Sequence, residues 1–340
     1  MTITDPSRVD ELPTPALVVE RPVFEANLAT MSAARPGGSL RPHLKAFKST
    51  AIAARLLAAG HDRFCAATIR ELEGVVAAGI EADLLLANEV VDCSRLGRLA
   101  AEGNRITVAV DSAETIRAAA AGGVRDVLID VEVGLPRCGC AVEEAGPLAT
   151  AARAAGLTVR GVMGYEGHLM MVADPAERAG RVERSMAKLL EAHAAVGGDI
   201  VSAGGTGTYA VNTWANEIQA GSYLLMDTQY ATLEVPFRIA LGVVASVISV
   251  SRKGWFVVDA GLKAFGMDHG NPTWPDGELQ FCSDEHSTLK PSEGDPLPAV
   301  GDRIRLLPAH VDPTVAKHEQ YWVLDGDTVV DRWPVDLRHW

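Results

Sequence analysis

The 340-residue sequence predicts an α/β protein in which a (β/α)8 TIM-type barrel is followed by a C-terminal all-β domain. Two observations predict this architecture. Between about residues 22 and 225, eight short runs of β-forming residues alternate with Ala-rich helical stretches, which is the pattern of βα units around a parallel sheet. After about residue 235 the helical periodicity ends, and Val/Ile runs are separated by Gly/Pro/Asp clusters at 270–277 and 291–301.

The eight strand runs are short and bounded by polar or small residues. They are expected at Ser39–Lys45, Arg63–Thr68, Asp83–Glu89, Arg105–Asp111, Val124–Val133, Leu157–Glu166, Asp199–Gly204 and Asn216–Tyr223. Helical patterns lie between them at Ser49–Ala59, Arg70–Ala78, Ala113–Ala121 and Pro175–Val196. We therefore expect a barrel over 21–234 and a β domain over 235–340. The Ala16–Val19 run within the N-terminal segment 1–20 has no place in the barrel and is expected to pair with the β domain.

Charge and composition exclude several classes of partner. Acidic residues outnumber basic residues by 44 to 31, and the net charge of −13 disfavours binding to nucleic acid or to an anionic membrane. Residues 1–20 lack the basic flank and apolar run of a secretory signal, so a cytoplasmic location is expected. Five cysteines without a zinc-binding pattern favour reduced thiols.

Catalytic groups of such a barrel lie where strands end and βα loops begin. The first expected strand closes with Arg41-Pro-His-Leu-Lys45. On a strand, His43 and Lys45 point to the same face, which would direct the lysine into the barrel mouth. A lysine amine among apolar walls loses part of its proton affinity and can attack a carbonyl. Taken alone, this feature favours a solvated strand-end charge at Lys45 over a catalytic lysine, and Lys48 competes with Lys45 for a catalytic role.

A glycine-rich segment, Ser202-Ala-Gly-Gly-Thr-Gly-Thr-Tyr209, follows the seventh expected strand. Such a loop can expose successive backbone N–H groups, and its threonines add hydroxyl donors, so it could hold a phosphate. Barrels often bind phosphate after strands seven and eight, where Gly221, Ser222 and Tyr223 add a second anion contact. A tight structural turn is the alternative explanation.

A third motif, Leu306-Leu-Pro-Ala-His-Val-Asp-Pro-Thr314, lies in the β region. On an extended segment, His310 and Asp312 face the same way and can bind one cation. Two protein ligands leave positions for water and substrate, as a catalytic metal requires. An ordinary surface loop would also explain this pair.

Further polar groups lie at strand ends or in the β region. Arg137, Tyr165 and His168 follow the fifth and sixth expected strands, whereas Asp259, Lys263, Glu285 and His286 have no role that the sequence assigns.

Together these residues resemble the fold-type III pyridoxal-phosphate enzymes of the D-threonine aldolase and D-serine dehydratase family. The resemblance covers nearly the whole chain. It rests on Thr14-Pro-Ala, Arg41-Pro-His-Leu-Lys45, Arg137-Cys-Gly139, Tyr165-Glu-Gly-His168, Gly204-Gly-Thr-Gly-Thr208, Gln219-Ala-Gly-Ser-Tyr223, Asp259-Ala-Gly, Asp284-Glu-His286 and Pro308-Ala-His-Val-Asp-Pro-Thr314.

The resemblance implies a role for each site residue. Lys45 would form the Schiff base with pyridoxal 5′-phosphate, and Arg137 and Tyr165 would line that cofactor. The phosphate would be held by Gly204, Gly205, Thr206, Gly207, Thr208, Gly221, Ser222 and Tyr223. A divalent metal would lie on His310 and Asp312, with His168 near the substrate as an acid or base. The sequence departs from the usual aldolase wording at Leu44, Ala46 and Phe47, which leaves the substrate range open.

The second metal ligand discriminates between the activities of this family. Its dehydratases show His-x-Cys, whereas its aldolases show His-x-Asp, as at Asp312 here. A carboxylate favours hard ions such as Mn²⁺ or Mg²⁺. The resemblance therefore favours an aldolase that cleaves a small β-hydroxy-D-amino acid to glycine and an aldehyde, working as a homodimer. A D-serine or 3-hydroxy-D-aspartate dehydratase is the alternative, and a racemase or a non-catalytic pyridoxal-phosphate carrier ranks third.

Overall fold

The computed structural model describes residues 6–340, so residues 1–5 of the expected N-terminal segment lie outside it. The chain divides into two compact units. We call residues 31–45, 52–221 and 337–340 the barrel unit, and residues 6–30, 46–51 and 222–336 the β unit. Each unit has its own sheet.

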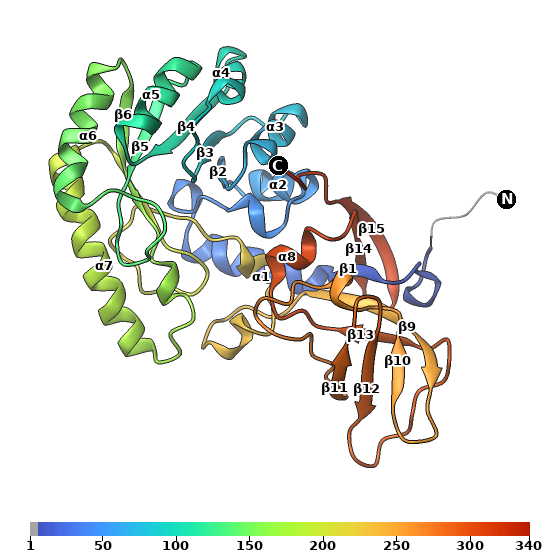
Figure 1. The fold of residues 1–340 in the computed structure, drawn as a ribbon. Helices are drawn as coiled ribbons and strands as arrows, with labels where there is room; N and C mark the ends of the chain where they lie inside the picture. The colour runs from blue at the N-terminus through green and yellow to red at the C-terminus, as the bar shows by residue number, and fades with distance from the viewer. Residues whose placement is uncertain (1–5) are drawn as a thin grey trace. The chain divides into compact units, whose positions relative to one another are not determined.

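The sheet of the barrel unit contains seven parallel strands in chain order (Figure 1). They are β2 (Arg63–Ala66), β3 (Asp83–Leu86), β4 (Arg105–Val110), β5 (Asp126–Asp130), β6 (Thr158–Gly164), β7 (Ile200–Ala203) and β8 (Glu217–Ile218). After a polar first residue, β2, β3, β4 and β5 are largely apolar and are buried, as expected for parallel strands that are covered on both faces. The predicted barrel-type α/β fold is confirmed.

The first expected strand, Ser39–Lys45, differs from the prediction. Leu40 forms a β-bridge to Ile218, and His43 forms one to Cys65, so this short segment pairs with both β8 and β2. It takes the place of an eighth strand, but it ends at His43. The next residues form the 3-10 turn η3 (Leu44–Ala46), because the chain bends before the following helix. Lys45 therefore lies just beyond the strand rather than on it.

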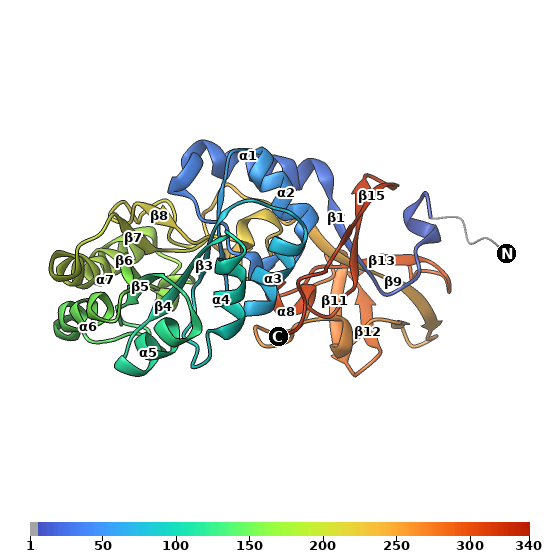
Figure 2. The ribbon, with the colours of Figure 1, turned by 90° about the horizontal axis from the view of Figure 1, so that it is seen from above.

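Helices connect the strands and cover the outer face of this sheet (Figure 2). They are α3 (Ile69–Ala77), α4 (Ser94–Ala101), α5 (Ala113–Gly122), α6 (Val142–Ala154) and α7 (Pro175–Val196). The helices α1 (Arg21–Ala34) and α2 (Thr50–Ala58) contain residues of both units. Helix α3 begins with a capping box: the Thr68 hydroxyl accepts a hydrogen bond from the Glu71 N–H, and the Glu71 carboxylate accepts one from the Thr68 N–H.

Buried side chains fill the inside of the sheet. One apolar cluster takes a residue from each of six strands: Cys65, Leu85, Ala109, Leu128, Met163 and Ile200. A network of charges lies at the opposite end from the βα loops. The fully buried Arg41 donates two hydrogen bonds to Glu217, at 2.7 and 3.0 Å, and Arg160 pairs with Asp83. Paired in this way, the buried charges are compensated.

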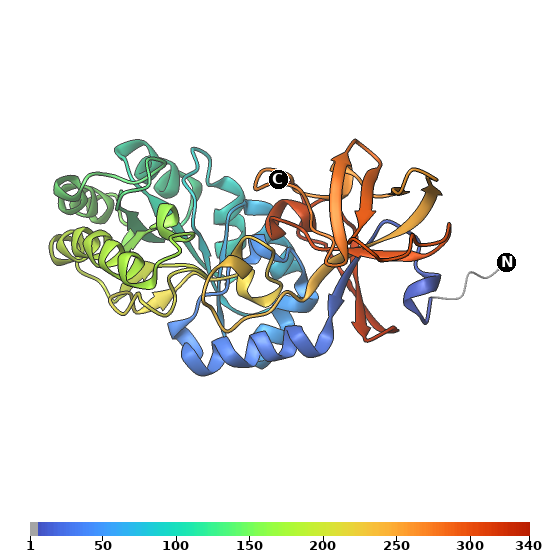
Figure 3. The ribbon, with the colours of Figure 1, turned by 90° about the horizontal axis from the view of Figure 1, so that it is seen from below.

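The sheet of the β unit runs in the order β11-β12-β10-β9-β1-β14-β15, and β13 pairs with β9. Its strands are β1 (Ala16–Glu20), β9 (Leu241–Val250), β10 (Phe256–Val258), β11 (Gly277–Cys282), β12 (Ser287–Pro291), β13 (Arg303–Leu306), β14 (Gln320–Asp325) and β15 (Thr328–Pro334). Strand β1 is antiparallel to β9 and parallel to β14, and Figure 3 shows this blue strand beside the orange and red ones. The Ala16–Val19 run therefore lies inside this sheet, where Val18 is fully buried.

None of the helices within residues 6–340 combines the length and the apolar character needed to cross a membrane.

Candidate active site

The predicted cofactor lysine lies immediately after the segment that joins β8 to β2. Lys45 is half-buried in η3, and its backbone N–H points to the Nδ1 atom of His43 at 3.4 Å. Its positive charge lies near the buried thiol of Cys65 on β2. Lys48 has a left-handed backbone with φ of 45° and belongs to the β unit. The two lysines thus occupy different structural contexts, which makes them separable by mutation.

The glycine-rich loop Gly204–Thr208 follows β7 and is buried along its length. It is organised by Glu166, a fully buried residue after β6. The Oε2 atom of Glu166 accepts the Gly204 N–H at 3.0 Å, and Oε1 accepts the Thr208 hydroxyl and the Asn212 amide, each at 2.9 Å. The sequence assigns no role to Glu166, although its position at the end of an expected strand could have marked it as a site residue.

Small residues are required in this loop. A Cβ atom at Gly207 would lie 2.1 Å from the Met170 backbone oxygen, and one at Gly205 would lie 2.8 Å from the Met170 sulfur. Gly204 also has a φ of 79°, which glycine adopts at little cost. These glycines bring the loop backbone close to its neighbours and leave the N–H of Gly207 without a hydrogen-bond partner in the described part of the chain.

Thr206 and Thr208 do not play equal parts. The Thr208 hydroxyl donates its proton to Glu166 and accepts the Gly205 N–H, so it serves the loop itself. The predicted phosphate contact of Thr208 would therefore compete with its hydrogen bond to Glu166. The N–H of Gly207 and the Thr206 residue are the groups that fit an anion here.

Arg137 lies in the segment after β5, and Tyr165 and the exposed His168 lie in the segment after β6. The Arg137 guanidinium lies 5.4 Å from the centre of the Tyr165 ring, within cation–π range. A Cβ at Gly134 would lie 2.7 Å from the imidazole of His168, so this glycine makes room for the histidine. Partial burial, aided by the charge of Arg181, lowers the pKa of His168. Its imidazole is therefore neutral at pH 7 and can accept a proton.

A buried acidic group lies beside these residues. Asp130 is the last residue of β5, and burial together with the charge and hydrogen bond of Glu89 raises the pKa of its carboxyl well above the usual range. The protonated form of the Asp130 carboxyl is therefore favoured beside the charge of Glu89. The Cys138 thiol is hydrogen-bonded to Glu89, and burial is the main cause that raises its pKa to about 11, so it stays protonated. The sequence did not single out this cluster, because Glu89 lies after β3 and Asp130 and Cys138 stand about 40 or more residues further along the chain.

The Gly221–Tyr223 segment is buried throughout. The Ser222 hydroxyl points to the Oδ2 atom of Asp312 at 3.4 Å. Tyr223 packs against Phe237 with ring centres 5.5 Å apart, and complete burial raises the pKa of its phenol. Tyr223 is therefore a neutral hydroxyl.

The predicted metal pair lies at the start of helix α8 (Val311–Val315) in the β unit. The Nε2 atom of His310 is 3.8 Å from the Oδ2 atom of Asp312. Two ligands that each lie about 2.1 Å from one ion are separated by roughly 3–4 Å, so this spacing fits a shared cation. One imidazole and one carboxylate suit a divalent ion such as Mn²⁺, Mg²⁺ or Zn²⁺.

Asp227 positions the backbone between these two ligands. It is fully buried, and its two carboxylate oxygens accept the N–H groups of Tyr230 at 2.8 Å and Val311 at 2.9 Å. Burial is the main reason that the pKa of Asp227 is raised. The preceding residue, Met226, has a φ of 56°, an uncommon value for a non-glycine residue. We missed Asp227 in the sequence, where it stands more than 80 residues before His310.

Two further residues stand beside His310. The Oδ2 atom of Asp268 is hydrogen-bonded to the Nδ1 atom of His310 at 2.7 Å. The His269 ring stacks on the His310 ring with centres 3.9 Å apart. Burial alone would raise the pKa of Asp268, but the hydrogen bond and charge of His310 outweigh it and the pKa is lowered. Asp268, His269 and His310 also satisfy the spacing of a metal-binding group. Sequence reasoning missed both neighbours.

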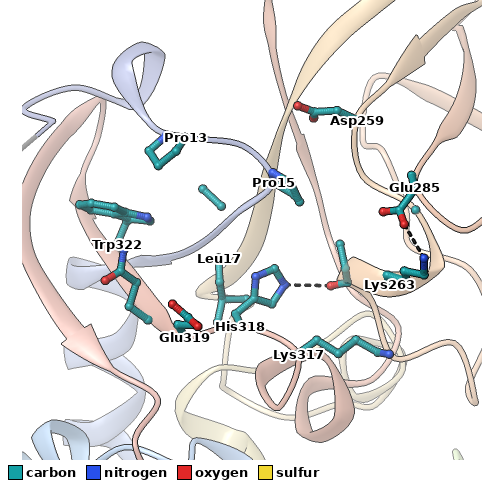
Figure 4. A pocket seen from close by; sticks show the side chains of 14 residues that line it. Pro13, Pro15, Leu17, Asp259, Lys263, Glu285, Lys317, His318, Glu319 and Trp322 are labelled. Atoms are coloured by element: carbon teal, nitrogen blue, oxygen red, sulfur yellow. Dashed lines mark hydrogen bonds and ion pairs between the residues drawn. The ribbon is translucent and has the colours of Figure 1, made fainter. Parts of the chain in front are cut away.

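The structure places the residues whose role the sequence left open. Asp259 accepts the Thr14 hydroxyl at 2.6 Å and the Ser246 N–H at 2.7 Å, so it fastens the start of β1 to β9. Lys263 pairs with Glu285 at 2.5 Å in an exposed position. Asp259, Lys263 and Glu285 line a cavity of about 340 Å³ within the β unit, shown in Figure 4. None of the residues that line this cavity belongs to the predicted cofactor or metal set.

The residues present fit both expected groups. Gly205 and Gly207 keep side chains out of a loop that offers backbone donors to a phosphate, and His310 with Asp312 forms a donor pair suited to a divalent ion. A lysine, an aromatic ring with a guanidinium above it, and a neutral histidine complete the set in the barrel unit. This collection can hold an aldehyde cofactor and transfer a proton.

Comparison with known proteins agrees with this geometry. Residues 19–229 match the family model described as "Alanine racemase, N-terminal domain", and residues 240–324 match "Putative serine dehydratase domain". A D-threonine aldolase of Arthrobacter sp is 35% identical over 98% of this chain and 93% of that protein. The crystal structure of D-threonine aldolase from Filomicrobium marinum has a TM-score of 0.91 and 36% identity, covering 98% of this chain and 97% of that one. A D-threo-3-hydroxyaspartate dehydratase of Delftia sp. (strain HT23) is 27% identical over 95% of this chain and 97% of that protein.

Proposed function

Since this chain belongs to the family of D-threonine aldolases and their dehydratase relatives, we propose that it is a pyridoxal-phosphate- and metal-dependent lyase. The reaction is the retro-aldol cleavage of a β-hydroxy-D-amino acid to glycine and an aldehyde. The observation that carries this proposal is the pairing of His310 with a carboxylate, Asp312, at the start of α8. In this family a carboxylate at the second ligand position is the aldolase pattern.

The residues of the barrel unit would hold the cofactor. Lys45 would attach it covalently through its amine, and the Gly207 N–H with Thr206 would bind its phosphate. Glu166 fixes the conformation of this loop by accepting hydrogen bonds from Gly204 and Thr208. When bound, pyridoxal phosphate supplies an electron sink for the bond that breaks at Cα. Arg137 and Tyr165 would line the ring.

The metal pair would orient the substrate. His310 and Asp312 would bind a divalent cation, and Mn²⁺ is the ion we propose, because the set of one imidazole and one carboxylate favours a hard ion. When bound, the cation supplies positive charge that lowers the pKa of the β-hydroxyl. His168 is neutral at pH 7, so it can accept a proton at a ring nitrogen and return it to the product.

Dehydration is the second candidate function. It is favoured by the full-length similarity to the Delftia dehydratase, which is 27% identical. Both reactions need the same lysine and a metal, but dehydration would release ammonia and a 2-oxo acid. Asp312 in place of a thiolate ligand makes aldol cleavage the first choice.

The test is metal dependence with both product pairs quantified. Chelated protein that retains its pyridoxal phosphate should lose all turnover of D-threonine and regain it on addition of Mn²⁺. The variant Asp312→Ala should behave like the chelated protein at any practical Mn²⁺ concentration. A chelated sample that stays fully active would contradict the metal-assisted mechanism.

We further propose a homodimer and a cytoplasmic location. The second rests on the five cysteines, all of which are free thiols. Sedimentation of the purified protein, and the enzyme's partition between cell fractions, test the two statements.

A further inference from the structure

The ring of His310 carries a second set of contacts on the side opposite Asp312. Its Nδ1 atom lies 2.7 Å from the Oδ2 atom of Asp268, whereas its Nε2 atom lies 3.8 Å from the Oδ2 atom of Asp312. The first distance is a hydrogen bond, and the second is the separation of two ligands of one ion. Nδ1 is therefore held by a hydrogen bond, whereas Nε2 faces Asp312 across the space that an ion would occupy.

The backbone around His310 is also fixed. The Thr314 hydroxyl donates to the His310 carbonyl at 2.7 Å and accepts the Gly266 N–H at 2.9 Å. A Cβ at Gly266 would lie 2.2 Å from a Pro313 side-chain carbon, so only glycine lets the segment that begins there approach α8. This close approach delivers the next residues, Asp268 and His269, to the face of His310.

His269 limits the remaining freedom of the ring. Its imidazole lies parallel to that of His310, with ring centres 3.9 Å apart and an angle of 7° between the planes. Its Nε2 atom is 3.8 Å from the same Asp268 oxygen that bonds His310. His269 thus covers one face of the ring but is not within hydrogen-bond distance of Asp268.

We infer that Asp268 is a positioning residue for the metal site: it holds the Nδ1–H tautomer of His310 and so presents Nε2, together with Asp312, to the divalent ion. His269 contributes by stacking, not as a ligand. A metal-bound histidine whose other nitrogen is held by a carboxylate binds its ion more tightly, and loss of such a partner typically costs about 10- to 100-fold in affinity. This inference rests on the proposed function for the identity of the metal pair.

The competing arrangement uses the same residues differently. Asp268, His269 and His310 could themselves be three ligands of one ion, bound through Nδ1 of His310. The distance of 2.7 Å between the Asp268 oxygen and Nδ1 argues against this, because two ligands of one ion are separated by roughly 3–4 Å. In that arrangement the nitrogen of His269 would be essential.

The experiment measures Mn²⁺ binding directly, by the paramagnetic resonance signal of free Mn²⁺ in metal-stripped protein that keeps its pyridoxal phosphate. Asp268→Asn should weaken binding about 10- to 100-fold, and Asp268→Glu should restore part of the loss. His269→Phe keeps a flat ring without a nitrogen and should stay within about threefold of the wild type. Asp327→Asn, an exposed charge change in the turn between β14 and β15, is the matched control.

A second readout needs neither metal nor activity. Long-range ¹⁵N–¹H spectra of histidine-labelled protein at pH 8 should show His310 with its proton on Nδ1, and Asp268→Asn should abolish this preference. Unchanged Mn²⁺ affinity and an unchanged tautomer in Asp268→Asn would overturn the inference. So would His269→Phe losing Mn²⁺ as completely as Asp312→Ala, which would assign the ion to the three-ligand arrangement. Because these results do not depend on turnover, a wrong choice between aldolase and dehydratase would leave them interpretable.

Discussion

Glu166 offers the sharpest test of how the barrel unit holds a phosphate. Its carboxylate accepts three hydrogen bonds, from Gly204, Thr208 and Asn212, and it is fully buried. In Glu166→Gln the amide oxygen can replace Oε1 and keep two donors. The amide NH₂ then faces the Gly204 N–H, so one bond is lost and a buried donor is left unpaired.

The structure sets the size of the effect. A hydrogen bond to a charged acceptor contributes roughly 1.5–3 kcal/mol, and an unpaired buried donor costs about 1–3 kcal/mol. Because both figures describe the loss of the same bond, they overlap and are not added in full. We expect the free energy of unfolding to fall by about 3 kcal/mol. If half to all of this appears as loosening of the Gly204–Thr208 loop, the affinity for pyridoxal phosphate falls about 10- to 100-fold.

The assay is a titration of cofactor-free protein with pyridoxal phosphate and, separately, with pyridoxal, which lacks the phosphate. Only the phosphorylated compound should bind more weakly to Glu166→Gln. Glu183→Gln, an exposed change on α7, is the control and should bind like the wild type. Equal weakening for both compounds, or no weakening, would refute the assignment of this loop to the phosphate.

Three further predictions follow from other parts of the molecule. Lys45→Ala should lose the borohydride-reducible attachment of pyridoxal phosphate, whereas Lys48→Ala should keep it; the opposite outcome in a tryptic mass map would transfer the role to Lys48. In Asp83, burial alone would raise the pKa, but the hydrogen bond from Arg160 and nearby arginine charges lower it from 3.8 to about 2, so its contribution to stability is present above pH 4 and lost as the pH falls through 2. Asp83→Asn should therefore lower the free energy of unfolding by about 2 kcal/mol at pH 6, and urea titrations should show the difference from wild type shrinking below pH 4. Asp227→Asn can accept only one of the two N–H groups that now bond to Asp227, so calorimetry should show Mn²⁺ binding weakened about tenfold; an unchanged dissociation constant would mean that the backbone before Asp312 needs no such support.

Much of the fold could be read from the sequence, because its signals are local. Each barrel strand is a short apolar run, and caps such as Thr68 with Glu71 mark where helices begin. The exception is the segment before Lys45. Its pairing with both β8 and β2 depends on closure of the sheet, and the 3-10 turn at Leu44–Ala46 has no distinctive sequence pattern.

The sequence predicted those parts of the candidate site whose residues are close together in the chain. It did not predict the residues that are far apart in the sequence and meet only in the folded protein. Gly204–Thr208 and the pair His310 and Asp312 each stand within a few residues of one another. Asp227 bonds to the backbone of Val311, 84 residues further along the chain, and Asp268 bonds to the side chain of His310, 42 residues further along. No spacing rule anticipates these two hydrogen bonds. Glu89, which follows β3, raises the pKa of Asp130 on β5 only because both strands belong to one sheet.

The central claim is that this chain cleaves the Cα–Cβ bond of a β-hydroxy-D-amino acid. The most direct measurement supplies D-threonine to the purified protein with pyridoxal phosphate and Mn²⁺, and quantifies glycine, acetaldehyde, ammonia and 2-oxobutyrate. We predict equal amounts of glycine and acetaldehyde, with neither of the other two. Ammonia and 2-oxobutyrate as the products would contradict the claim and assign the chain to dehydration.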